Sequence, residues 1–255
     1  MLKIENFEVL GWEHAIRGMR NPMNSWEKSD SFIPCYQKTE CHKCEVNQKC
    51  TYYFEDGNPY KKDDFIGPND YALMKNLRNA GTDHRKFMRM ITVYLDIIAP
   101  LYWWKEFDTY KVGTVANSCS TMHKIHSKEF TIDDFSCEHL VDNAGIEIGV
   151  PDHDELEHIP FSSRTMLELT TDILNVFREM YLKSKDKKYW WQMIQLLPSS
   201  YNQKRTVMLN YEVLSNIYKS RRNHKLDEWH TFCDWIESLP YSELIIGKEN
   251  SNESI

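Results

Sequence analysis

Long apolar runs and a secretory signal are both missing from this sequence. No segment approaches the roughly 20 consecutive apolar residues that a membrane-spanning helix needs. Residues 1–10 carry acidic side chains early and lack the basic, apolar and small-residue order of a signal peptide. We therefore expect a cytoplasmic protein, in which the seven cysteines serve as thiols or metal ligands rather than as a disulfide framework.

Basic residues are also in short supply. Lys and Arg number 31 against 38 Asp and Glu, which gives a formal net charge of −7 at pH 7. Sequence-independent binding to DNA or RNA needs a dominant basic surface, so this balance argues against a nucleic acid partner. A local cluster of Arg and Lys can still hold a small anionic ligand on an acidic protein.

The residues that are present fit one packed domain. Hydrophobic residues make up 41% and aromatic residues 13% of the 255 residues, which is ample material for a core. We expect a single domain over residues 1–247, with a cysteine-rich inserted loop at 34–62 and a disordered tail at 248–255. Apolar spacing predicts helices at 14–20, 70–79, 163–183, 187–196 and 207–239, and a strand at 88–100. The acidic stretch 127–162 is expected to be a partly mobile connection.

The inserted loop holds four cysteines in the pattern Cys35-x5-Cys41-x2-Cys44-x5-Cys50. Four thiols within 16 residues, with a central C-x-x-C, can close a tetrahedral structural zinc site. The outer spacing is unusual, however, and the loop is rich in Lys and Gln. Incidental surface cysteines are therefore the open alternative.

The last long helix is the most informative element. Asn210 and Arg221 are 11 residues apart, about three turns, so they project from nearly the same face. Asn216 points away from that face, which lets the helix serve two surfaces. The alternative roles are local, because an Asn near a helix start can cap it and an Arg near its end can complement the helix dipole.

The stretch 196–210, continued through to Trp229, resembles the C-terminal half of the flavin-dependent thymidylate synthases (ThyX type). Members of that family place a Leu-Pro, a Tyr three residues after the Pro, an Asn, a Leu-x-Asn and an Arg at this spacing. The matching positions here are Leu197, Pro198, Tyr201, Asn210, Leu214, Asn216 and Arg221. A second match covers residues 99–102, 105–107 and 109–120, so the resemblance spans about half of the chain.

The resemblance implies an α/β (α+β) fold, with a central twisted sheet flanked by helices, assembled into a homotetramer with sites at subunit junctions. It also implies FAD as the cofactor, NADPH and methylenetetrahydrofolate as co-substrates, and reductive methylation of dUMP or a related pyrimidine nucleotide. Two alternatives stay open on the same scaffold. One is a non-catalytic or regulatory nucleotide-binding relative, and the other is a different pyrimidine-modifying reaction.

The resemblance also implies which residues form the site. Those expected at the flavin are His84, Arg85, Tyr110, Lys111, Asn117, Asn210 and Asn216. Those expected at the nucleotide are Glu106, Cys119, Ser120 and Arg221. The catalytic candidates are Tyr110, Lys111 and Cys119. Plainer alternatives remain, because 83–86 is also a solvated charge run and Cys119 can be a small replacement for the family's Ser.

The family's signature is altered in this chain. Its Arg-His-Arg triplet reads Thr109-Tyr110-Lys111, and its Glu and Gln fall on Asn117 and Glu106. Two further arginines that grip nucleotide phosphate in the family fall on Thr121 and Ile194. Lys is a point charge and cannot form a planar bidentate fork, so we expect substitute phosphate ligands. The candidates are Arg17, Arg20, residues 83–86, His123, Lys124 and His126.

Overall fold

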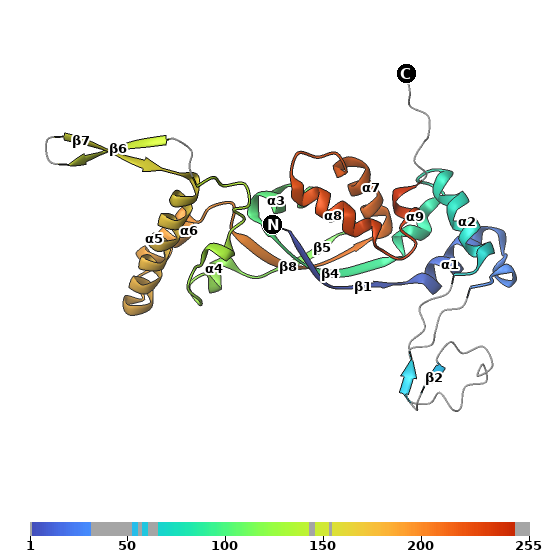
Figure 1. Cartoon of the computed structure of the whole chain (residues 1–255). Helices are drawn as coiled ribbons and strands as arrows, with labels where there is room; N and C mark the ends of the chain where they lie inside the picture. The colour runs from blue at the N-terminus through green and yellow to red at the C-terminus, as the bar shows by residue number, and fades with distance from the viewer. Residues whose placement is uncertain are drawn as a thin grey trace, which may run out of the picture.

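The computed structural model describes residues 2–31, 53–55, 58–60, 66–142, 146–152 and 155–247. Its centre is a four-stranded antiparallel sheet in the order β1-β4-β8-β5 (Figure 1). The strands are Lys3–Leu10 (β1), Thr92–Pro100 (β4), Val115–Ser118 (β5) and Asn202–Asn210 (β8). Two hairpins lie apart from this sheet, Tyr53–Glu55 (β2) with Asn58–Tyr60 (β3), and Ile146–Asp152 (β6) with Glu155–Phe161 (β7).

Helices cover one face of the sheet and extend past both of its ends (Figure 1). Trp12–Arg20 (α1), Pro68–Asn79 (α2) and Glu243–Ile246 (α9) lie at one end. Leu101–Phe107 (α3), Tyr211–Arg221 (α7) and Asp227–Glu237 (α8) lie over the sheet. Thr121–Lys124 (α4), Ser163–Ser184 (α5) and Lys187–Leu196 (α6) form the other end. Short 3-10 helices are Asn21–Met23 (η1), Trp26–Lys28 (η2), Arg85–Arg89 (η5) and Ile132–Asp134 (η6).

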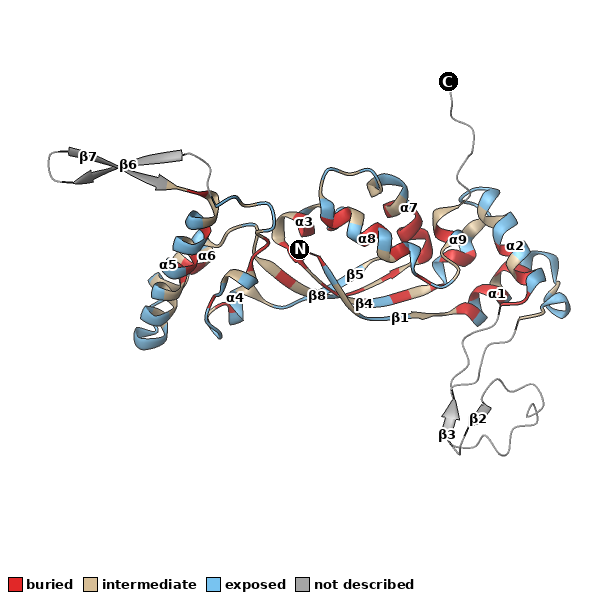
Figure 2. Cartoon of the chain, viewed as in Figure 1, coloured by how far each residue is buried: buried red, intermediate tan, exposed pale blue. Residues whose placement is uncertain are grey.

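Strand β4 shows why the sheet has one covered face. Val93, Leu95 and Ile97 alternate along the strand and are buried, whereas Tyr94 between them is exposed. Figure 2 shows buried and exposed stretches following one another along β4. Successive strand residues point to opposite faces, so the apolar set lies beneath the helices. An aromatic cluster covers it, made of Trp103, Trp104, Phe107, Trp229 and Phe232. A second, smaller core lies between α5, α6 and the segment around η6.

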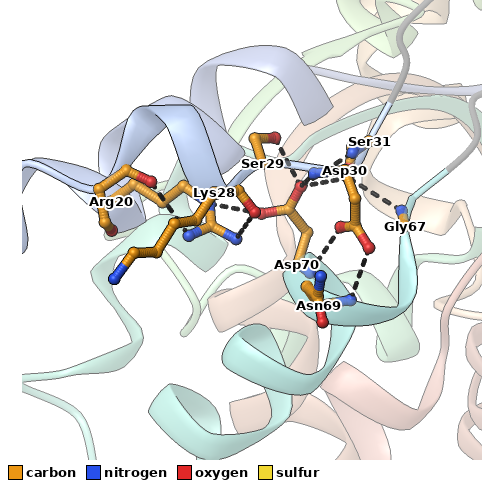
Figure 3. Close-up of polar contacts among 9 residues, drawn as sticks. Arg20, Lys28, Ser29, Asp30, Ser31, Gly67, Asn69 and Asp70 are labelled. Carbon is orange, nitrogen blue, oxygen red and sulfur yellow. Dashed lines mark hydrogen bonds and ion pairs between the residues drawn. The ribbon is translucent and has the colours of Figure 1, made fainter.

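Buried polar contacts clamp the segment before the insertion to α2 (Figure 3). Arg20 and Asp70 form a buried ion pair, with Nε 2.6 Å from Oδ1. The Asp30 carboxylate accepts hydrogen bonds from the backbone N–H groups of Asn69 and Asp70, which satisfies two donors at the start of α2. Position 67 must be glycine, because a Cβ on Gly67 would lie 2.2 Å from Asp30 Cγ. The two ends of the insertion therefore leave the domain from one fixed point.

Two predicted boundaries are wrong. The strand expected at 88–100 begins only at Thr92, because the preceding 3-10 helix η5 buries Phe87 and Met88 in the core. The helix expected at 207–239 is instead the end of β8 followed by α7 and α8. Val207 and Leu209 are buried on one side of β8, and pairing with β4 and β5 makes this segment a strand.

Other expectations are confirmed. The α+β fold of a sheet flanked by helices is observed, and α1, α2, α5 and α6 lie where helices were predicted. The stretch 127–162, expected to be a partly mobile connection, contains η6 and the β6–β7 hairpin, and its mobility stays a prediction. The single-domain division stays a prediction, and most of residues 34–62 and all of 248–255 lie outside the described residues. Within the described part of the chain, no helix has the length and apolar character needed to cross a membrane.

Candidate functional site

A cavity of about 330 Å³ lies where the end of α3, the turn that follows it, β5 and β8 meet. Its walls are Phe107, Asp108, Tyr110, Lys111, Thr114, Ala116 and Arg205. Two of these residues, Tyr110 and Lys111, are catalytic and flavin-binding candidates from the sequence. Phe107 belongs to the buried aromatic cluster, so the cavity floor is part of the rigid core.

The turn between α3 and β5 lies against the start of α7. Gly113 has φ +77°, a left-handed conformation that favours glycine. A Cβ on Gly113 would lie 3.0 Å from Asn210 Nδ2 and 3.1 Å from Val213 Cγ2. A side chain at this position would therefore push the turn away from the helix. The turn and the start of α7 therefore lie in close contact.

Helix α7 begins with a side-chain cap. Asn210 Oδ1 accepts a hydrogen bond of 3.0 Å from the backbone N–H of Val213. The capping alternative raised from the sequence therefore applies to the Asn210 oxygen. The Asn210 amide nitrogen faces the Gly113 turn instead, so the same side chain also borders the candidate site.

Arg221, at the other end of α7, joins two predicted site residues. Its Nε donates to the Tyr110 hydroxyl at 2.9 Å, and its Nη1 donates to Glu106 Oε2 at 2.7 Å. The same Glu106 oxygen accepts from Trp229 Nε1 at 3.0 Å and lies 3.3 Å from His224 Nε2. The Arg221 guanidinium also lies over the Trp229 ring, 4.8 Å from its centroid. The structure thus brings together Glu106 from α3, Tyr110 from the turn after α3, and Arg221 from α7.

A second group of predicted residues meets on another side of α7. Arg85 Nη2 donates to Asn216 Oδ1 at 3.3 Å, and Arg85 Nε lies 3.3 Å from Glu212 Oε1. Arg89 also donates to Glu212. Burial opposes ionisation of Glu212, but the hydrogen bonds and charges of Arg89 and Arg85 hold the pKa of its carboxyl below the ordinary value. His84 is exposed at the start of η5, beside this group.

The remaining predicted residues lie further along β5. Asn117 is exposed and sits opposite Thr206 of β8. Cys119 is an exposed free thiol, and its Sγ makes no hydrogen bond to any residue that the structure describes. Ser120 caps the short helix α4, since its Oγ accepts from the backbone N–H of His123 at 3.1 Å. None of these three contacts Arg221 or Tyr110 within the described part of the chain.

Most of the substitute phosphate ligands proposed from the sequence are elsewhere. The assignment of Arg20 is wrong, because this side chain is buried in its ion pair with Asp70 at the far end of the molecule. His126 packs against Tyr181, with ring centroids 4.9 Å apart, and burial lowers its pKa. Arg17 is exposed on α1. The four cysteines of the predicted zinc site lie outside the described residues, and the described ones contain no group of three metal-ligating side chains.

Sequence reasoning missed Arg205, the most firmly held cation at the cavity. Arg205 lies on β8, and its Nη1 donates to Asp108 Oδ1 at 2.8 Å. The guanidinium lies over the Trp104 ring, 4.2 Å from the centroid. The strand pattern of residues 202–210 was the signal that could have found it, because alternation sets Arg205 and Val207 on the face opposite Thr206.

Comparison with known proteins gives a clear structural likeness. No family model and no curated protein matches the sequence. The structure is similar to the flavin-dependent thymidylate synthase ThyX from Helicobacter pylori, complexed with FAD and dUMP, with a TM-score of 0.57 and 14% identity over 96% of this chain and 97% of that one. A second crystal structure of the same enzyme with FAD and dUMP has a TM-score of 0.58 and 13% identity, over 96% of this chain and 98% of that one.

A related likeness extends to a second enzyme. The UMP/dUMP methylase PolB from Streptomyces cacaoi, bound with 5-Br dUMP, has a TM-score of 0.50 and 14% identity over 93% of this chain and 89% of that one. Identities this low establish architecture alone. These likenesses show that this chain has the flavin-dependent thymidylate synthase fold.

Proposed function

We propose that this protein binds FAD and a pyrimidine nucleotide and reductively methylates dUMP or a related nucleotide, using methylenetetrahydrofolate and NADPH. The observation that carries this proposal is the junction of Tyr110, Glu106 and Arg221 between the α3–β5 turn and α7. All three positions are among the site residues that the family resemblance implies. The similar structures are described as bound to FAD with dUMP or to 5-Br dUMP, which supports the same ligand class.

The junction offers the hydrogen-bonding pattern that a uracil ring needs. Uracil presents carbonyl oxygens that accept and an N3–H that donates. Arg221 supplies donors and Glu106 supplies an acceptor in one small region, with side chains 18% and 34% exposed. Because Arg221 Nε already donates to the Tyr110 oxygen, the Tyr110 hydroxyl proton is free to donate to a ligand. The Tyr110 ring provides a face for stacking.

The residues on this chain fit part of FAD. When bound, the flavin would accept hydride from the nicotinamide and pass it to the pyrimidine methylene group. The cavity of about 330 Å³ is at the small end of the range for ligand pockets, so it is too small for a whole dinucleotide. Arg85 and Asn216 offer further polar contacts, and Lys111 can offset a phosphate or reduced-flavin charge. The remaining surface would come from another copy of the chain.

We therefore propose a homotetramer, and helix α5 supplies a surface suited to pairing between copies. Five apolar residues separated by alternate steps of three and four form one exposed stripe, which we call the α5 stripe. These residues are Met166, Leu169, Ile173, Val176 and Met180, between 37% and 54% exposed. This is the a/d spacing by which one helix packs along another. A stripe that pairs with its own copy is the isologous contact typical of symmetric oligomers.

Purified protein tests the flavin part of the proposal. We expect a yellow preparation, or one that becomes yellow when loaded with FAD, whose flavin absorbance is bleached by NADPH. With methylenetetrahydrofolate present, label should be released from C5-labelled dUMP. A preparation that cannot be loaded with FAD contradicts the enzymatic proposal.

Arg221→Ala tests the nucleotide part. Loss of a charged hydrogen-bond donor costs about 1.5–3 kcal/mol, so we expect the Kd for dUMP to rise at least tenfold. The matched control is Arg222→Ala, because Arg222 is the next residue and also pairs with a carboxylate, Asp234 at 2.7 Å. Both variants should retain the wild-type circular dichroism spectrum. Equal dUMP affinity in the two variants would remove Arg221 from the site.

One observation favours a second candidate, a regulatory nucleotide-binding relative. Glu106 neutralises Arg221, and Lys111 is the one cation in the triplet 109–111. Such a site has less charge available for a flavin and its phosphates than one with three basic residues. Binding of dUMP by a chain that does not load FAD would support this candidate over the enzyme.

A further inference from the structure

We propose that Arg205, Lys111 and Thr114 form an anion site for the phosphate monoester of the nucleotide, in the cavity between the α3–β5 turn and β8. The identity of the ligand as a nucleotide rests on the proposed function. The anion site itself rests on a positioned guanidinium, a positive balance of charge on the cavity walls, and a buried hydroxyl with no partner among the described residues.

Arg205 is held rigidly at the cavity wall. Its Nε donates to Gln203 Oε1 at 3.0 Å and its Nη1 to Asp108 Oδ1 at 2.8 Å. Below it, the Trp104 ring is itself fixed, because Trp104 Nε1 donates to the Gln203 carbonyl at 3.0 Å. A guanidinium already held over an aromatic ring loses little entropy when an anion binds. The side chain is 15% exposed, which leaves it open to the cavity.

The charge balance of the cavity walls favours an anion. Arg205 and Lys111 are the cations among the lining residues, and Asp108 is the one carboxylate. The Asp108 side chain is 49% exposed, so its ion pair with Arg205 is of the weak, solvated kind that an arriving dianion can replace or share. Lys111 is exposed at the same rim and is available to close over the anion.

Thr114 supplies the evidence that does not depend on charge. Thr114 is a wall residue of the cavity, and its Oγ1 is enclosed, with no hydrogen-bond partner among the residues that the structure describes. An unpaired buried hydroxyl is unfavourable, and each one in a folded protein calls for an explanation. Rotation of the Thr114 side chain about its Cα–Cβ bond would turn the hydroxyl towards a phosphate oxygen in the cavity, which would accept its proton and remove that cost. An apolar ligand has no acceptor for the Thr114 hydroxyl and would leave it unpaired.

The two positions where the family resemblance places phosphate-gripping arginines carry no cation here. Those positions are Thr121 at the start of α4 and Ile194 on α6, and Ile194 packs against the second core. A phosphate held near Arg205 would therefore be gripped from β8 and the α3–β5 turn instead. This relocates the phosphate contacts and explains how a nucleotide site could survive the loss of the signature arginines.

The test is titration calorimetry on the purified chain with dUMP, deoxyuridine and inorganic phosphate. We expect wild-type protein to prefer dUMP to deoxyuridine and to bind inorganic phosphate weakly. In Arg205→Gln the preference for dUMP over deoxyuridine should fall about tenfold or more, since a charged hydrogen bond is lost. Affinity for deoxyuridine should stay within about twofold. The matched control is Arg164→Gln on α5, another arginine paired with carboxylates, which should bind like wild type.

Thr114→Val separates a binding role from a structural one. Replacing the unpaired hydroxyl by a methyl group should leave the Tm of the ligand-free protein unchanged or raise it. The same variant should bind dUMP and inorganic phosphate several-fold more weakly. If Arg205→Gln does not fold, the exposed Lys111→Gln carries the test, with the same expected loss of dUMP preference. Wild-type affinities for phosphate and dUMP in the folded variants would overturn the site.

The outcomes distinguish this proposal from the proposed function. Binding of inorganic phosphate that is lost in Arg205→Gln, by a protein that shows no affinity for dUMP, would reject the nucleotide function and retain the anion site. Tight dUMP binding that is unaffected by Arg205→Gln and Thr114→Val would retain the function and reject the site. The anion site is also rejected if wild-type protein binds dUMP and deoxyuridine equally and binds no inorganic phosphate.

Discussion

Asp70 shows how much a single buried side chain organises. Its two carboxylate oxygens accept five hydrogen bonds (Figure 3). The donors are the Arg20 guanidinium, the Ser29 hydroxyl, the backbone N–H of Asp30, and the backbone N–H and hydroxyl of Ser31. Burial alone would oppose ionisation, but the hydroxyl groups of Ser29 and Ser31 and the Arg20 charge hold the pKa of Asp70 below its ordinary value of 3.8. The carboxylate is therefore the form that the fold requires.

Asp70→Asn should strongly destabilise the protein, because it leaves the buried Arg20 without a counter-charge. We expect a loss of about 3–5 kcal/mol in the free energy of unfolding, measured by urea denaturation at pH 7. Asp234→Asn is the control, because the Asp234 side chain is 64% exposed in its ion pair with Arg222. This exposed pair should contribute no more than about 1 kcal/mol to the free energy of unfolding. A loss of less than 1 kcal/mol in Asp70→Asn would contradict the clamp.

The pH dependence has a defined sign. A carboxyl whose folded pKa lies below its unfolded pKa stabilises the protein above the unfolded value and loses that contribution as pH falls through the folded one. Asp70 thus contributes fully above about pH 4, near the ordinary value of 3.8, and progressively less below it. The Asn variant should lack this part of the acid-induced loss of stability.

At the scale of elements, Asp96 ties three strands together on the open face of the sheet. It lies on β4 and accepts hydrogen bonds from Thr206 on β8 at 2.6 Å and from Asn6 on β1 at 3.0 Å. Lys204 Nζ lies 3.1 Å away and also contacts Glu5. Polar pairing of this kind lets the sheet expose one face to water while burying the other.

Asp96→Asn should weaken the sheet mainly at neutral pH. The hydrogen bonds of Thr206, Asn6 and Lys204 lower the pKa of Asp96 to about 2. Its contribution is therefore complete above about pH 4 and is lost as pH falls towards 2. We expect about 1–2 kcal/mol less stability at pH 7, and a smaller difference from wild type near pH 2. Urea denaturation midpoints of wild type and Asp96→Asn between about pH 2 and 7 measure this difference. Asp133→Asn, at an exposed position, is the control. A difference between wild type and Asp96→Asn that stays constant with pH would contradict the lowered pKa of Asp96.

For the whole molecule, the α5 stripe predicts the state of assembly. Ile173→Glu places a charge at the centre of the stripe, and burying an unpaired charge between two helices is costly. We expect wild-type protein to run as a tetramer in light scattering at micromolar concentration and the variant to run as smaller species. FAD loading should fall in parallel, because one chain offers only part of the dinucleotide surface. Glu168→Gln, an exposed polar site on the same helix, should assemble normally.

The contrary result is equally clear. A wild-type monomer, or an Ile173→Glu variant with unchanged mass, would remove the α5 stripe from the assembly. The circular dichroism spectrum of the variant should match that of wild-type protein, since position 173 is exposed in the single chain. A variant that unfolds instead would be replaced by Val176→Glu, the most exposed member of the stripe.

The sequence by itself determined what depends on local spacing. Helical periodicity placed α1, α2, α5 and α6, and the 11-residue interval between Asn210 and Arg221 marked the two ends of α7. The residue types of the α3–β5 turn pointed to a segment that lines the cavity in the structure. Periodicity failed at 202–210, because a short apolar segment is a strand or a helix according to what pairs with it.

Only the tertiary structure decided which distant side chains meet. Glu106 and Arg221 are 115 positions apart, and Asp30 caps a helix that begins 38 residues later, so no local pattern encodes either contact. Arg205 reaches the cavity because β8 runs between β4 and β5, which carries its side chain to Asp108 and Trp104. The physical reason is that local spacing fixes periodicity, whereas a charge pair or a shared cavity depends on strand order and on what burial excludes from water.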